Sequence, residues 1–201
     1  MVFRKGGRPP AFIWYYDGME LEAAKCFKYL GIVLSTSGSF SETQKTLASQ
    51  GEKALFSLYR YTNKFVNLCP EFMIDLFGKL IEPVLSYGCE VWGFHTGSSI
   101  ERVHTKFCKS ILHVRNSTPN IIVLAELDRL DMQTRRLVRI VKYWLKILTS
   151  ENNVLVKQMY NMLRFEAEQG KTNWASLIRD KLMSLGFGYV WFNQAVNNVS
   201  Q

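Results

Sequence analysis

The spacing of the apolar residues changes once along this chain, close to Ser41. Before that point, short aromatic and β-branched runs alternate with turn-forming pairs, which is typical of strands. After it, apolar residues recur every three or four positions, which is typical of amphipathic helices. We therefore predict an α+β chain that is mainly α with a small N-terminal β part: strands over 1–40, a helical region over 41–150 and a helical extension over 151–201.

Two segments carry the strand signals. Trp14-Tyr15-Tyr16 precedes Asp17-Gly18, a strong hairpin turn, and residues 19–22 alternate as the return strand would. Residues 26–34 are predicted to form one further strand, closed by the Ser/Gly-rich run 35–39. Three or four strands do not make a stable sheet by themselves, so we expect them to be the remnant of a larger sheet.

Helices are predicted to begin at Ser41, Pro70 and Ser98, and to cover about 118–127, 132–149, 152–168 and 173–185. Ser98 and Glu101 have the spacing of a capping box. Pro83 is expected to kink or end the helix that begins at Pro70. The residues predicted to be buried in that helix are Met73, Leu76, Phe77, Leu80, Ile81 and Val84.

The basic residues are concentrated in one part of the chain. The whole sequence has 25 Lys and Arg against 17 Asp and Glu, and residues 101–150 hold ten of the former and four of the latter. Four of these basic residues are predicted to share one face of a helix: Arg135, Arg139, Lys142 and Lys146. Arg136 lies beside this face. The opposite face is predicted to be Leu137, Ile140, Val141, Trp144 and Leu148. This stripe is either a solvated helix face or a surface that follows a phosphate backbone.

Other candidate sites are weaker. Arg4, Lys5 and Arg8 lie in a short basic segment that either contacts phosphates or is a simple turn. His104 and Cys108 are four apart, as metal ligands can be, but their apolar neighbours favour core packing, and we predict no metal or cofactor. The four cysteines are widely spaced and are predicted to be free and mostly buried, which indicates an intracellular protein, nuclear or cytoplasmic.

Several segments, in order, resemble non-LTR (LINE-type) retrotransposon reverse transcriptases. Residues 27–32, FKYLGI, are similar to the FxYLGI strand late in the polymerase palm, and residues 14–22 to the hairpin before it. Residues 80–93, LIEPVLSYGCEVWG, resemble the LxPxLxYGxExW block that follows the palm. Residues 100–112 and 117–120 continue the series.

The resemblance implies the last palm strands followed by a thumb-like helical region. It implies a primer-grip-like hairpin at Phe27, Tyr29, Leu30 and Gly31, and an RNA template and DNA primer as partners. Polymerisation in that family needs paired aspartates that hold two metal ions, Mg²⁺ in the intact enzyme. None of the five aspartates here is adjacent to another, so this fragment is not expected to be an enzyme by itself.

Other functions stay open on the sequence. The chain is alternatively a non-functional retroelement remnant, a helical module that binds a protein partner, or a domain adapted to an unrelated role. Salt-dependent binding to nucleic acid would separate the first expectation from these.

Overall fold

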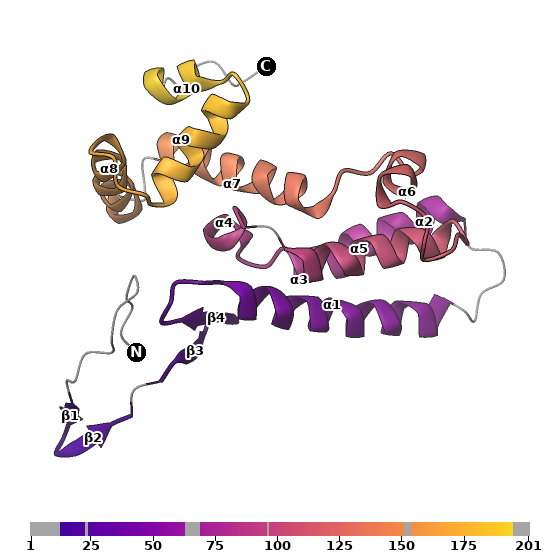
Figure 1. The fold of residues 1–201 in the computed structure, drawn as a ribbon, viewed down its shortest axis with the longest axis horizontal. Coiled ribbons are helices and arrows are strands. Elements are labelled where there is room, and N and C mark those ends of the chain that lie inside the picture. Colours follow the sequence, from indigo (N-terminus) through magenta and orange to yellow (C-terminus); the bar gives the residue numbers. More distant parts are fainter. Residues whose placement is uncertain (1–12, 23, 63–68, 96, 151–153, 195–201) are drawn as a thin grey trace. The chain divides into compact units, whose positions relative to one another are not determined.

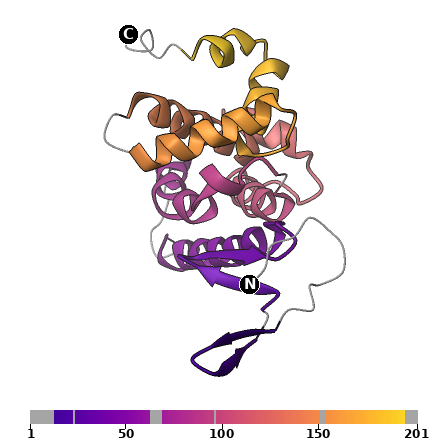
Figure 2. The ribbon, with the colours of Figure 1, turned by 90° about the vertical axis from the view of Figure 1, so that its left-hand side faces the viewer.

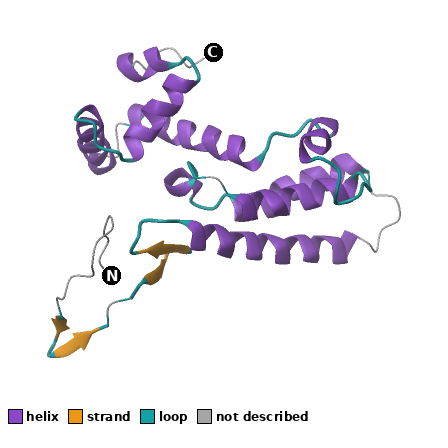
Figure 3. Ribbon diagram, viewed as in Figure 1, coloured by secondary structure: helices purple, strands orange, loops and turns teal. Residues whose placement is uncertain are grey.

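The computed structural model describes residues 13–22, 24–62, 69–95, 97–150 and 154–194. Arg4, Lys5 and Arg8 lie outside this range. The described chain is mainly helical with a small N-terminal β part, as the spacing predicted, and this β part consists of two small hairpins (Figure 1, Figure 3). The helices are α1 Ser41–Thr62, α2 Pro70–Leu76, the π-helical turn η1 Phe77–Ile81, α3 Glu82–Leu85, α4 Cys89–Trp92, α5 Ser98–Ile111, α6 Asn120–Glu126, α7 Met132–Thr149, α8 Val154–Glu168, α9 Trp174–Ser184 and α10 Gly188–Asn193. In the described part, no helix has the length and apolar character needed to cross a membrane.

The strands form two separate antiparallel hairpins. β1 (Trp14–Tyr16) pairs with β2 (Met19–Leu21) across Asp17-Gly18, whose φ angles are both positive, as in the turn that was predicted. The single strand predicted over 26–34 is wrong. β3 (Cys26–Tyr29) turns at Leu30-Gly31 and pairs with β4 (Ile32–Ser35). Among the described residues each hairpin is its own two-stranded sheet, so the predicted three-strand arrangement does not form.

The contacts of the chain divide it into two compact units. The first holds both hairpins, α1 to α3, α5 and α6; the second holds α4, α7 from Gln133 onward, and α8 to α10. The predicted divisions at residues 40 and 150 follow local patterns rather than contacts, and they stay predictions.

The apolar face of helix α1 packs into the core of the first unit. Leu47, Leu55 and Leu58 are buried at the spacing that the sequence indicated. Gly51 lies in the same stripe, and a Cβ there would collide with the side chain of Leu85, so the glycine permits close approach of α1 and α3. Facing residues of α5 complete the core: Ile100, Val103 and Phe107.

The π-helical turn changes which residues of α2 to α3 are buried. Pro83 has no N–H and cannot close an α-helical bond, and the chain widens just before it, where the Glu82 N–H bonds to the carbonyl of Phe77. The helix therefore continues past the proline. Phe77 and Ile81 are fully buried as predicted, but Leu80 is 55% exposed and Leu85 is fully buried in its place. Among the other predicted positions, Met73, Leu76 and Val84 are half-buried.

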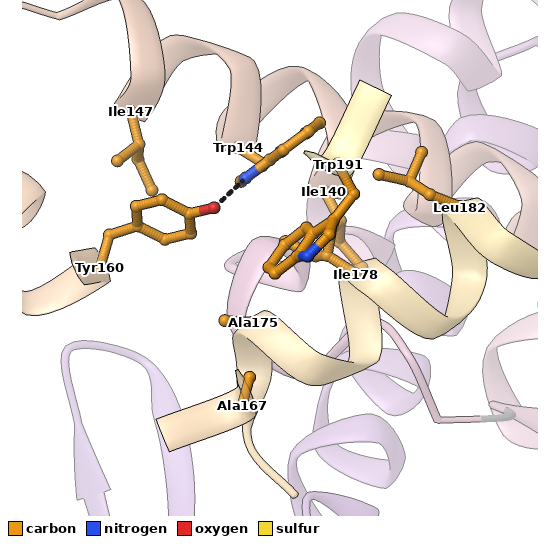
Figure 4. Close-up of a cluster of buried hydrophobic side chains, with 9 residues drawn as sticks. All are labelled: Ile140, Trp144, Ile147, Tyr160, Ala167, Ala175, Ile178, Leu182 and Trp191. Atoms are coloured by element: carbon orange, nitrogen blue, oxygen red, sulfur yellow. Dashed lines mark hydrogen bonds between the residues drawn. The ribbon is translucent and has the colours of Figure 1, made fainter. Parts of the chain in front are cut away.

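The core of the second unit is built by aromatic side chains of α7, α8 and α10 (Figure 4). The indole N–H of Trp144 donates to the hydroxyl of Tyr160 at 2.9 Å, and the rings of Trp144 and Trp191 stack at 6.0 Å. Burial raises the pKa of Tyr160, which keeps the phenol neutral. Helix α9 begins with a capping box between Asn173 and Ser176.

Candidate nucleic-acid interface

The tip of the β3–β4 hairpin is held in a fixed position. Strand β4 lies beside the first part of α1 (Figure 2). There the Thr43 hydroxyl donates to the Val33 carbonyl at 2.7 Å and accepts from the Val33 N–H at 3.1 Å. At the turn, the Tyr87 hydroxyl donates to the Leu30 carbonyl at 2.9 Å. Gly31 has φ +86°, and a Cβ on it would lie 3.0 Å from the Tyr87 ring. Two sequence motifs more than fifty residues apart therefore meet here.

Most residues predicted for a primer grip lie on the surface of this hairpin. Phe27, Tyr29 and Leu30 are 54%, 58% and 74% exposed, and Gly31 forms the turn. A rigid hairpin with two exposed rings is suited to stack against bases or sugars, because aromatic faces accept any base. The sequence left Tyr87 without a role. Tyr87 belongs to the motif at residues 80–93, which marked it as a residue of interest. Its hydrogen-bond partner, the Leu30 carbonyl, could not be predicted from the sequence.

Helix α7 carries the predicted basic stripe on one face. Lys142 and Lys146 are exposed, and Arg135 and Arg139 are half-buried. Helix α7 contains no acidic residue, so nothing on the helix itself neutralises the stripe. From Arg135 to Lys146 the stripe extends about 16 Å along the helix axis, at the usual rise per residue. A surface of this length and sign can meet several phosphates of a duplex.

Arg136 does not belong to this surface, which corrects the prediction. It is 1% exposed, and its guanidinium lies 5.4 Å from the centre of the Trp92 ring. Its position follows from the helix itself: Met132, Arg136 and Ile140 are four apart and share the buried face. Among the residues predicted to oppose the stripe, Ile140 and Trp144 are fully buried, whereas Leu137, Val141 and Leu148 are partly buried at its edge.

His104 belongs to a buried polar network. It is fully buried and contacts the Phe77 ring, and Cys108 is also fully buried. Both positions agree with the prediction that these two side chains pack in the core. His104 accepts at Nε2 from Arg129 at 3.1 Å and is 3.3 Å from Glu101 at Nδ1. Arg129 also faces Glu82 at 3.7 Å. No group of three metal-binding side chains occurs in the parts of the chain that the structure describes.

Glu101 has a different role from the predicted one. Helix α5 has no side-chain cap, so the capping box with Ser98 is not formed. One Glu101 oxygen instead accepts from the backbone N–H of Met132 at 2.8 Å, and the other faces His104. The carboxylate thus satisfies an N–H of the first turn of α7.

The cysteines divide into two classes. Cys89 and Cys108 are buried, as predicted, whereas Cys26 and Cys69 are exposed. Burial, with a smaller effect from the Glu90 carboxylate, raises the pKa of Cys89 to about 12. This thiol is therefore unreactive in the folded protein.

Comparisons with protein-family models, with curated proteins and with solved structures found no match to this chain.

Proposed function

We propose that this chain is a C-terminal part of a non-LTR retrotransposon reverse transcriptase and that it holds the template–primer duplex by its backbone. The proposal starts from the series of motifs in the sequence. One structural observation supports it most: Lys142 and Lys146 are exposed and Arg135 and Arg139 are half-buried on one face of α7, while the other side of that helix is buried. Contacts of this kind position a duplex without reading its sequence.

The hairpin gives the proposal a second element. In such an enzyme, β3–β4 would be the late palm hairpin, and its exposed rings Phe27 and Tyr29 would lie against the primer. The contact of Tyr87 with Leu30 fixes the hairpin tip to the helical part that follows. In this proposal Mg²⁺ and the catalytic aspartates belong to the intact enzyme, and the fragment supplies binding alone.

The test is binding of an RNA–DNA hybrid across a salt series. If the stripe makes roughly four phosphate contacts, log K falls with log salt at a slope of about −3 to −4. The pair Lys142→Ala and Lys146→Ala removes two exposed cations and is expected to reduce the slope by about 2. A matched pair, Lys53→Ala and Lys106→Ala, removes the same charge from exposed positions on α1 and α5 and should leave the slope nearly unchanged.

An equal effect of both pairs of substitutions would show that only net charge matters, and would reject α7 as the binding surface.

Absence of hybrid binding by the unchanged chain would favour the second candidate function, a helical module that binds a protein. The observation behind this protein-binding alternative is the surface of α8. Four large apolar side chains on one side of this helix are more than half exposed: Leu155, Met159, Met162 and Phe165. Exposed apolar surface of this kind is common at protein interfaces.

A further inference from the structure

The loop that leads into α1 borders a hollow of about 390 Å³ in the first unit. Its wall combines the serine-rich loop, the first turn of α1 and one histidine from before α5. The lining residues are Ser37, Gly38, Ser39, Phe40, Ser41, Gln44 and His95. The proposed contact surfaces on β3–β4 and α7 use none of these residues.

Hydrogen-bond donors surround this hollow. Helix α1 has 22 residues, and in its first turn the N–H groups of Glu42 and Thr43 have no carbonyl within the helix to bond. The Ser41 and Gln44 N–H groups already bond to the Ser39 hydroxyl and the Phe40 carbonyl. The loop hydroxyls form a chain in which Ser39 donates to Ser41 at 3.2 Å. Among the described residues, the Ser41 hydroxyl has no acceptor, so its proton is available to a ligand.

Gln44 is the second and independent observation. It is 93% buried, since its relative exposure is 7%, and it lines the hollow. Its backbone N–H bonds to the Phe40 carbonyl, but its side-chain amide has no hydrogen-bond partner among the described residues. Gln44 is not among the described residues whose side-chain polar atoms are both shut off from solvent and unpaired, so its amide reaches the hollow and can donate to a ligand there.

The groups that line the hollow indicate that its ligand carries a negative charge. The first turn of a helix favours negative charge, and hydroxyl and amide N–H groups donate to oxyanions. The one carboxylate of this turn, Glu42, is already paired with Lys45 at 2.8 Å. His95 is exposed at the rim and adds a further donor.

We propose that this hollow is a binding site for a phosphate-class oxyanion, held by the first turn of α1, the loop serines and the Gln44 amide. The proposal is independent of the α7 stripe, which lies in the other unit. The phosphate group comes either from a small molecule or from a nucleic-acid backbone, and the experiment separates these two sources.

The probes are inorganic phosphate and a short RNA–DNA hybrid, followed by NMR of the ¹⁵N-labelled full chain. We expect phosphate to shift the Gln44 side-chain resonance with an affinity of about millimolar, as suits a few neutral donors. Ser39→Glu places a negative charge at the rim, and we expect it to weaken phosphate binding roughly tenfold. Ser49→Glu, an exposed serine further along α1, adds the same charge and should change it little.

Gln44→Leu provides a second variant, because it removes the amide and keeps a buried side chain of similar size. Circular dichroism confirms that each variant is folded. Loss of phosphate binding alone identifies a small-molecule site, and loss of binding to both probes identifies a backbone phosphate; either result supports the site. Unchanged phosphate and hybrid binding in both Ser39→Glu and Gln44→Leu, or no Gln44 shift with either probe, would overturn it.

Discussion

The two units of this chain use charged side chains in different ways. In the first unit, Arg129 and His104 lie inside the fold and bond to each other, and the partly buried Glu101 contacts His104. In the second unit, the core is a cluster of tryptophan, tyrosine and aliphatic side chains, and the lysines of α7 stay outside. Residues of one basic segment thus serve as internal structure in both units, at Arg129 and Arg136, and as a candidate binding surface in the second.

This comparison changes how the charge of residues 101–150 is interpreted. Ten basic residues lie there in the sequence. The side chain of Arg129 is 5% exposed and Arg136 is 1% exposed, and both guanidinium groups lie over aromatic rings. A count of basic residues therefore overstates the surface charge, and only an experiment on individual side chains separates the two roles.

The largest effect is expected for Arg129→Ala in the first unit. The change leaves Glu82 and His104 buried without the guanidinium, and we expect a loss of about 3–5 kcal/mol in the free energy of unfolding. Urea denaturation measures this loss. Arg115→Ala, an exposed arginine, is the control and should change stability by less than about 0.5 kcal/mol.

The buried thiols report on each unit separately in the same experiment. Cys108 lies in the first unit and Cys89 in the second, and both are protected from alkylation until they are exposed. With Arg129→Ala, we expect Cys108 to become labelled at lower urea concentration while Cys89 keeps its original midpoint. An equal shift of both cysteines would mean that the two units unfold together as one cooperative structure.

A smaller effect is expected for Trp144→Phe in the second unit. The phenylalanine ring is smaller and has no N–H, so the buried Tyr160 hydroxyl loses its donor. We expect a loss of about 1–3 kcal/mol, measured by thermal or urea unfolding. Tyr143→Phe removes a hydroxyl from a partly exposed ring on the same helix and serves as the control.

The smallest effect is expected at the hairpin. Gly31→Ala places a Cβ at φ +86° and 3.0 Å from the Tyr87 ring. For a residue with a Cβ, the positive φ alone costs roughly 1–2 kcal/mol. Gly18 in the other hairpin has φ +72° and open space around it. Gly18→Ala therefore loses stability only through the strained backbone conformation. A larger loss for Gly31→Ala than for Gly18→Ala would measure the contact with Tyr87; equal losses would show that this contact contributes nothing.

Helical periodicity made most of the fold predictable, and tertiary contacts explain what was missed. Helices α1, α5 and α7 have long amphipathic repeats, and their positions were predicted from spacing alone. The β3–β4 turn was missed because Leu30 has φ +45°, a conformation that leucine rarely adopts and that its contact with Tyr87 supports. Arg136 was assigned to the surface by its charge, whereas its place between Met132 and Ile140 determined its burial.

The π-helical turn has a consequence for how this sequence can change in length. A residue added to a regular helix rotates everything after it by about 100°, and so moves the apolar face away from its partner. The turn at Phe77–Ile81 already accommodates one extra residue locally, and Gly78 within it has open space around it. A one-residue deletion there, combined with replacement of Pro83, would restore an ordinary helix and keep Leu85 directed at Gly51. In an alignment of related chains, a gap in the middle of this helix would thus be compatible with an unchanged core.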